Sequence, residues 1–199
     1  MPDTGAPWNI PFLDGTELVR AYPDFSEDLA DAVADGLSAA GGLVAVKSAI
    51  FTGTQTESVT AGNNVAVTNL SVTHEVADPA NRLIISAFIG AAAETTNTGR
   101  VGIAVHYGTG LIGVGDADGN RSRVSAGGRT TGGSGDDVTV YPSVTFAHTP
   151  GAGSKTYTVR AVNMNTGTQT LFVNRNRAND NDQRSPVAIS SLVIQEVKV

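Results

Sequence analysis

A glycine-rich stretch is the nearest approach in this sequence to a cofactor-binding motif. The residues GTGLIG at 108–113 match the spacing G-x-G-x-x-G and follow a predicted strand, VGIAVHY. A dinucleotide site also needs a helix directly after the glycines, because the helix N-terminus holds the pyrophosphate. The next residues, VGDADGN, do not begin a helix, and the chain contains no βαβ pattern. The stretch therefore predicts a hairpin turn and no bound cofactor.

Two acidic loops carry oxygen ligands at spacings that calcium sites use. Asp116, Asp118 and Asn120 match the opening of a calcium-binding loop. Arg121 stands where that loop needs glycine, however, and no bidentate Glu follows at the required distance. The second loop is ANDND at 178–182. Short polar residues of this kind more often form turns, so we predict no metal ligand in either loop.

The potential nucleophiles, bases and acids predict a protein without catalytic residues. The histidines fall on three different predicted strands: His74, His106 and His148. Ser134 lacks the G-x-S-x-G spacing of a nucleophile elbow. Asp136 and Asp137 are adjacent, so in a strand they would face opposite ways, which does not suit paired acid–base work. A glycan-processing enzyme would need positioned carboxylates in a groove, and no such pair stands out in this chain.

Arginines gather in two groups, near 121–129 and near 175–184. Two explanations are open: a solvated surface balanced by neighbouring acids, or recognition of an anionic glycan. Three polar loops, 93–99, 127–137 and 175–186, have the composition of binding loops on a rigid scaffold. The expected receptor contacts are Arg129, Asp136, Arg175, Arg177, Asp180 and Arg184.

The composition excludes several classes of protein. The 199 residues include no cysteine, which excludes a disulfide framework and thiolate chemistry. No stretch approaches the ~18 apolar residues of a membrane-spanning helix, and we expect neither membrane insertion nor a secretory signal. The net charge is −6, so nucleic acid, which binds basic surfaces, is not an expected partner. Abundant Thr, Ser, Asn and Gly favour strands and turns.

The charge is divided unequally along the chain, which predicts two units of different kind. Residues 1–46 hold eight acidic residues and one base, a net charge of −7, whereas residues 47–199 have a net charge of +1. The glycines at 41–42 provide a boundary. We therefore expect an acidic anchoring segment over residues 1–42 and a nearly neutral body over residues 43–199.

The anchoring segment begins with a proline-rich stretch that we interpret as an extended strap. Residues 1–15 carry prolines at positions 2, 7 and 11 and the only tryptophan of the chain. This proline density disfavours helix and regular sheet, and Trp and Phe often anchor interfaces. A disordered tail is the alternative for a terminus. We expect the anchoring segment to attach to its partner through Trp8, Ile10, Phe12, Leu13, Leu18, Tyr22 and Phe25.

A short helix is predicted to follow the strap and to end at the glycines at 41–42. Asp24 and Glu27 have the spacing of a capping box at its start. Its apolar stripe consists of Leu29, Val33 and Leu37. A helix of this length is marginal alone, so the stripe needs a partner surface. Packing on the body and a three-helix bundle in an oligomer are both open.

The body is predicted to be all-β, with the architecture of a jelly roll, a β-sandwich or a barrel. Short alternating runs are broken by turn residues at roughly ten-residue spacing. The clearest pair is 155–163 and 168–174, joined by a turn at 163–167. The predicted strands are 43–52, 64–73, 82–91, 100–107, 110–115, 121–126, 138–148, 155–163, 168–174 and 187–199.

The last predicted strand is apolar on both faces. Leu192 and Ile194 point one way, while Val193, Val197 and Val199 point the other. A strand of this kind is buried on both faces, so in a two-layer sandwich its second face needs a cover. We expect the cover to be another subunit or the anchoring segment. A central strand shielded by the N-terminal helix is the simplest form of the second case.

Several short patterns set the two units apart: PWNIP, LVR and AAGGLV around the acidic helix, then KTYTVRAVNMNTGTQTLFVNR and SSLVIQEVKV in the body. The first group resembles the N-terminal segments of tailed-phage virion proteins, particularly minor tail and fibre-like proteins of phages infecting actinobacteria. The second group is similar to phage appendage heads. Those heads resemble the trimeric jelly rolls of tumour-necrosis-factor-like and complement globular-head proteins.

The resemblance implies a non-enzymatic protein on the virion surface, at the tail or on the capsid exterior. It implies a homotrimer whose N-terminus binds phage capsid or tail proteins and whose body contacts a host-surface glycan, as in a minor tail or fibre-like protein. The chain has no long coiled coil or collagen-like shaft, so the expected molecule is a squat knob. The alternative is a capsid decoration protein that binds and stabilises the shell.

Overall fold

The structure is a computed structural model that describes residues 42–94, 99–130, 138–178 and 187–199. It confirms the all-β prediction, because the described residues form twelve strands and no helix. The strands are β1 (Leu43–Phe51), β2 (Gln55–Val59), β3 (Asn64–Val76), β4 (Arg82–Phe88), β5 (Ala91–Ala93), β6 (Gly99–Tyr107), β7 (Gly110–Ile112), β8 (Ala126–Thr130), β9 (Ser143–His148), β10 (Gly153–Asn163), β11 (Gln169–Val173) and β12 (Ser190–Val197).

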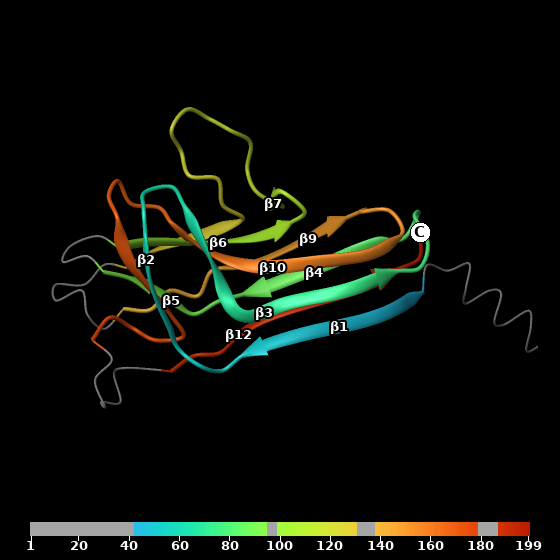
Figure 1. The fold of residues 1–199 in the computed structure, drawn as a ribbon, viewed down its shortest axis with the longest axis horizontal. Coiled ribbons are helices and arrows are strands. Elements are labelled where there is room, and N and C mark those ends of the chain that lie inside the picture. The colour runs from blue at the N-terminus through green and yellow to red at the C-terminus, as the bar shows by residue number, and fades with distance from the viewer. Residues whose placement is uncertain (1–41, 95–98, 131–137, 179–186) are drawn as a thin grey trace, which may run out of the picture. The chain divides into compact units, whose positions relative to one another are not determined.

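The strands pair like a long hairpin folded over on itself (Figure 1). The first strand pairs with the last, β1 with β12, and the pairing continues inward. β2 pairs with β11, β3 with β10, β4 with β9, and β6 with β8, all antiparallel. Nested antiparallel pairing spread over two sheets is the topology of a jelly roll.

Two sheets face each other across the core. One has the strand order β1-β12-β4-β9, and the other has the order β3-β10-β6-β7, with β8 also paired to β6. A third, smaller sheet of order β2-β11-β5 continues from the ends of β1 and β4. Each large sheet packs one face against the other sheet, as in a β-sandwich, and β6 is buried on both faces along Val101–Val105.

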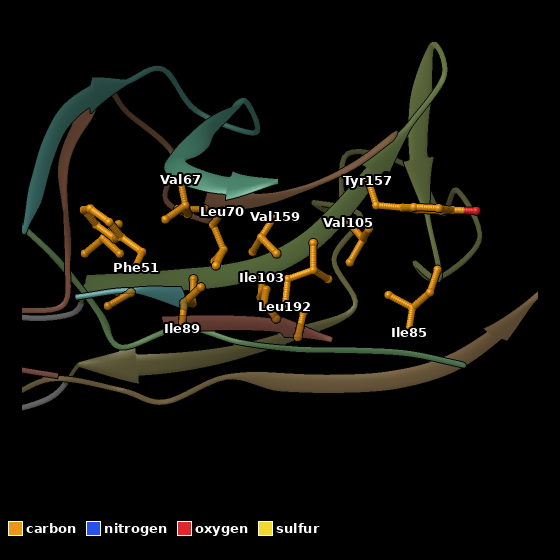
Figure 2. Close-up of a cluster of buried hydrophobic side chains, with 14 of the residues drawn as sticks. Phe51, Val67, Leu70, Ile85, Ile89, Ile103, Val105, Tyr157, Val159 and Leu192 are labelled. Carbon is orange, nitrogen blue, oxygen red and sulfur yellow. The ribbon is translucent and has the colours of Figure 1, made fainter. Parts of the chain in front are cut away.

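The core forms because alternate residues of each strand point between the sheets. On β12, Leu192, Ile194 and Glu196 are buried, and the residues between them are half-buried. Figure 2 shows Leu192 gathered with Ile103 of β6 and Val159 of β10 in this core, and all three are fully buried. Removing a side chain of this size from water contributes ~1.5–3 kcal/mol, so the alternating pattern is the main source of stability.

Asn174 fastens the small sheet to the ends of the longer strands. Its φ of +60° is left-handed, a conformation that Asn tolerates better than most residues. The buried side chain donates to the carbonyl oxygens of Phe51 at 2.8 Å and Gly53 at 2.9 Å. It accepts a hydrogen bond from Ser190 Oγ at 2.6 Å. The start of β12 is thereby held against the end of β1.

Two parts of the predicted strand list are wrong. The strand expected at 121–126 is β8, which begins only at Ala126, so 127–130 is a strand and not part of a loop. The glycines of β8 hide it from the alternating pattern, yet they are needed there. A Cβ built on Gly128 would lie 2.8 Å from Val140 Cβ. β2, with the polar sequence QTESV, is absent from the predicted list, and so is β5 as a separate strand, because one strand was predicted over 82–91.

The pair 155–163 and 168–174 does form strands, β10 and β11, but they belong to different sheets. The predicted turn between them is confirmed, since Asn163 Nδ2 donates to the carbonyl oxygen of Gly167 at 2.8 Å. β10 pairs with β3 and β6, whereas β11 pairs with β2 and β5. The turn therefore carries the chain from one sheet to another.

Several predictions concern residues outside the described ranges. They include the strap, the helix with its stripe, and the virion-anchoring residues, all within residues 1–41. The division of the chain at 42/43 stays a prediction for the same reason. Three of the predicted receptor contacts also lie outside: Asp136, Asp180 and Arg184.

Candidate functional site

An apolar surface lies on the solvent side of the β1-β12-β4-β9 sheet, and we call it the outer sheet face. Register places Val46 of β1 opposite Gln195 of β12, which is in turn opposite Ile84 of β4. Residues directly opposite in an antiparallel pair share one face. The apolar members of the outer sheet face are Leu43, Val46, Ile50, Ile84, Phe88, Val193 and Val197.

The outer sheet face is strongly exposed along β1. Leu43 is 59% exposed, Val46 50% and Ile50 60%. At the Phe88 end, the exposed ring of Tyr141 stacks on Phe88 with ring centroids 6.1 Å apart. Contiguous exposed apolar patches are uncommon on monomeric proteins and mark interaction sites. This face is therefore the strongest candidate for a protein-binding surface among the described residues.

The outer sheet face is also almost without charge. Between its apolar side chains the paired strands place serine, threonine, alanine and glutamine. Arg82, opposite Val197, is the charged residue among these paired positions. A surface of this composition suits an apolar, uncharged partner, since nothing on it calls for charge complementarity.

The structure bears out the two-faced prediction for the last strand. Leu192 and Ile194 are in the core, and Val193 and Val197 lie half-buried on the opposite face. β12 is central, between β1 and β4, so its backbone is fully paired. Val199 follows the strand and is 72% exposed. Val193 and Val197 on this second face are therefore only half-buried, and the predicted cover, another subunit or the anchoring segment, stays a prediction.

A buried polar cluster joins the two large sheets. His74 Nε2 of β3 lies 2.7 Å from Glu196 Oε2 of β12, and both side chains are at most 2% exposed. Glu196 Oε1 accepts hydrogen bonds from Asn81 Nδ2 at 2.6 Å and from the Ala77 amide at 3.1 Å. His74 Nδ1 has no hydrogen-bond partner among the described residues. This geometry suits an imidazole that carries a proton on Nε2 and donates it to the carboxylate.

The environment of Glu196 keeps it ionised. Burial on its own would raise the pKa of this carboxyl group, but hydrogen bonds from Asn81, His74 and the Ala77 amide outweigh burial, and the pKa is lowered. A dyad with no solvent access and no hydroxyl bonded to its imidazole has no nucleophile to activate. The arrangement therefore points to a structural role.

The three histidines occupy separate environments. His148 Nδ1 lies 3.1 Å from the Tyr157 hydroxyl, with Tyr107 stacked on Tyr157 at 5.1 Å. Burial, and then the charge of Lys155, lower the pKa of His148. Burial, and then Tyr107, raise the pKa of Tyr157. His106, on β6, pairs across the strands with Thr158 and does not join either cluster.

The predicted receptor contacts that the structure describes have different surroundings. Arg129 of β8 is exposed and directly opposite Arg100 of β6. Arg175 is engaged within the protein, because its Cζ lies 4.5 Å from the centre of the Phe172 ring and its Nη2 donates to Thr56 Oγ1 at 2.8 Å. Arg177 is half-buried. Receptor contact by these residues stays a prediction.

The glycine-rich stretch and the first acidic loop lie in the described part of the chain, whereas Asp180 and Asp182 of the second acidic loop lie outside it. The predicted hairpin at 108–113 is confirmed, since β6 and β7 pair Tyr107 with Gly110 and Gly108 has a φ of +58°. In the loop that follows, Asp118 Oδ2 pairs with Arg121 Nη1 at 2.7 Å on the surface. No group of three potential metal-ligating side chains occurs in the described part of the chain.

Sequence reasoning missed the exposure of β1 and the place of Arg100. The exposure of β1 could have been suspected from the sequence, because LVAVKSAIF is apolar on both faces, as the last strand is. Arg100 gave no comparable signal, since its position opposite Arg129 depends on a glycine-rich strand that the pattern hides.

No family model matches the chain, and a search of curated proteins finds no relative. None of the described residues form a helix that is long and apolar enough to cross a membrane.

Proposed function

We propose that this chain is a non-enzymatic protein of a phage virion surface, a trimeric knob attached by its N-terminal segment, with the β body exposed for attachment to a host-surface glycan. The observation that carries the proposal is the outer sheet face. Its exposed apolar residues, Leu43, Val46 and Ile50, need a partner. The virion assignment comes from the resemblance of residues 1–42 to phage anchoring segments.

The partner of the outer sheet face is other copies of this chain. Three observations support that choice. The face carries one charged residue, Arg82, so two copies can meet without like-charge repulsion. β1 is an edge strand, and an exposed apolar edge is a liability unless an assembly covers it. Apolar interface cores are typical of permanent homo-oligomers.

The body begins its first strand at Leu43, directly after the predicted helix, and residues 1–42 contain no long coiled-coil or collagen-like repeat. This favours the second candidate, a capsid decoration protein in which the N-terminal segment clamps the shell. The copy number on purified particles separates the two. Hundreds of copies would support decoration, and a handful would support a minor tail protein.

A deletion phage tests host attachment directly. If the body contacts the host, particles that lack the protein should adsorb poorly to host cells while their heads stay intact. If the protein cements the shell, particles should adsorb normally and lose genome on heating or at low salt. Normal adsorption together with normal particle stability would contradict both candidates.

A further inference from the structure

A recess of about 600 Å³ opens where three turns meet beside β6. The turns are at 60–63, at 163–167 and in the loop 113–125 that projects from β7 in Figure 1. The volume lies in the range of small-ligand sites. Its polar lining residues are Arg100, Asn120, Arg121, Ser122, Asn165 and Thr166.

The recess is cationic. Two arginines line it, and none of its lining residues is acidic. Arg121 is paired with Asp118, but Arg100 has no ion-pair partner within the described ranges. Arg100 is also directly opposite Arg129 in the β6–β8 ladder. Like charges directly opposite in a sheet are destabilising, and a bound anion would relieve the repulsion.

The backbone around Arg100 is fixed by asparagine side chains. Asn165 Oδ1 accepts from the Arg100 amide at 3.1 Å, and Asn165 Nδ2 donates to the Arg100 carbonyl oxygen at 3.0 Å. Asn163 Oδ1 accepts from the Asn165 amide at 2.9 Å. The Gly62 amide donates to the Asn163 carbonyl oxygen at 3.1 Å. The walls of the recess are therefore held before any ligand arrives, which lowers the entropic cost of binding.

The recess also has an apolar floor. Met164 lines it and lies over Gly102 and Gly127, which face each other across β6 and β8. A Cβ built on Gly127 would lie 2.6 Å from Met164 Sδ, and one on Gly102 would lie 3.0 Å from it. Only glycines leave room for this thioether. An apolar floor beside cationic and polar walls matches a ligand with a C–H face and an anionic group.

We propose that this recess binds a sugar residue carrying a carboxylate, sulfate or phosphate, with Arg100 holding the anionic group and Met164 packing against the ring. The inference rests on the proposed function, which it narrows from a host-surface glycan to an acidic one. It also places the contact at Arg100, outside the three loops in which receptor contacts were predicted.

Ligand-observed NMR on the full chain tests the inference with four probes: glucuronate, glucose 6-sulfate, glucose 6-phosphate and glucose. We expect at least one acidic sugar to bind with a Kd of ~1 mM or tighter and glucose to bind at least ~10-fold more weakly. Arg100→Gln should weaken acidic-sugar binding by ~10-fold or more, because it removes a hydrogen bond to a charged group. Ser122→Trp should block the recess sterically.

Lys47→Gln is the control, since it removes an exposed cation of β1, in the opposite sheet and outside the outer sheet face, and should leave binding unchanged. Circular dichroism melting curves check that each variant folds. Equal binding of glucose, equal binding by Arg100→Gln, or no binding of any acidic sugar would each overturn the inference. Inorganic sulfate binding as tightly as glucose 6-sulfate would overturn the sugar assignment. These results leave the virion assignment standing, because that is tested on particles.

Discussion

Glu196 places a carboxylate among apolar side chains on the inner face of β12. Its two oxygens take hydrogen bonds from three donors on other segments, His74, Asn81 and the Ala77 amide. Because the donors lie on β3 and in the turn after it, the cluster links β12, in one large sheet, to the facing sheet that contains β3. Removing an acceptor that serves several buried donors is costly, because each donor is left without a hydrogen-bond partner.

Replacing Glu196 should therefore destabilise the protein strongly. Glu196→Ala leaves two buried donors, His74 Nε2 and Asn81 Nδ2, and the part-buried Ala77 amide without their acceptor. We expect a loss of ~2–5 kcal/mol in the free energy of unfolding. Urea denaturation followed by circular dichroism measures it. Glu75→Ala, on the exposed face of β3, is the control and should stay within ~0.5 kcal/mol of the wild type. Equal effects from the two variants would contradict the structural role of the cluster.

The same residue predicts how stability changes with pH. The pKa of Glu196 is lower in the folded protein than its ordinary value of 4.5. The stability that its carboxylate contributes is therefore fully present above pH 4.5 and is lost as pH falls through the lower folded pKa. Melting temperatures from pH 7 to pH 2.5 should fall in that acidic range. In Glu196→Gln this part of the fall should be absent, and an unchanged profile would contradict the assignment.

At the scale of elements, the loop after β7 depends on a close approach to β9. Gly113 has a φ of +61°, and a Cβ there would lie 2.6 Å from the Phe146 ring. Gly119, in the same loop, has a φ of +54° with open space around its Cβ position. The two glycines share the backbone conformation and differ in packing.

This difference gives a matched pair of variants. Gly119→Ala should cost ~1–2 kcal/mol from the left-handed backbone alone. Gly113→Ala should cost ~1–3 kcal/mol more, because it also forces the Phe146 ring to move. Thermal or urea unfolding measures both. Equal losses would show that the contact between the loop and Phe146 is absent in solution.

If copies of the chain assemble through the outer sheet face, one charged residue introduced into this face on β1 should block self-assembly without unfolding the chain. Val46 is 50% exposed, so Val46→Lys should fold normally and place an ammonium group in the apolar interface. Native mass spectrometry should show three times the 20.4 kDa chain mass for the wild type and a single chain for the variant.

Ser154→Lys, on the exposed side of β10, is the control for this experiment and should stay trimeric. A trimeric Val46→Lys variant would place the interface elsewhere on the molecule. A monomeric wild type would contradict self-assembly through the outer sheet face.

The alternating pattern predicted most of the long strands correctly, because buried and more exposed side chains alternate from one residue to the next along them. β10 and β12 could be placed from Tyr157, Val159, Leu192 and Ile194 alone. Pairing could not be predicted in this way, since each partner is chosen by residues far away in the chain. For this reason β10 and β11, neighbours in sequence, were expected together and lie in different sheets.

The candidate sites were less predictable than the strands. The outer sheet face could be predicted in part, because the sequence of β12 is apolar on both faces of the strand. The sequence of β1 has the same property. The recess at Arg100 could not be predicted from the sequence, because Gly102 and Gly127 lie beneath its floor and turns form its walls. From the sequence alone, a glycine that leaves space for a neighbouring side chain cannot be distinguished from a glycine that forms a turn.

At the scale of the whole molecule, the described body is all-β, and the acidic segment before it resembles phage anchors. The outer sheet face, proposed for self-assembly, and the recess, proposed for a ligand, lie on opposite sheets of the body. A protein on a virion surface would use both features together with an anchoring segment, and this is the location that we propose.

The most direct test of that claim is to find the protein on intact particles. Purified particles of the phage that encodes it would be labelled with a gold-conjugated antibody against residues 43–199 and imaged by electron microscopy. We predict gold on the particle surface, at the tail for a minor tail protein or over the head for a decoration protein. Unlabelled particles, with the protein detected only in the infected-cell lysate, would contradict the account.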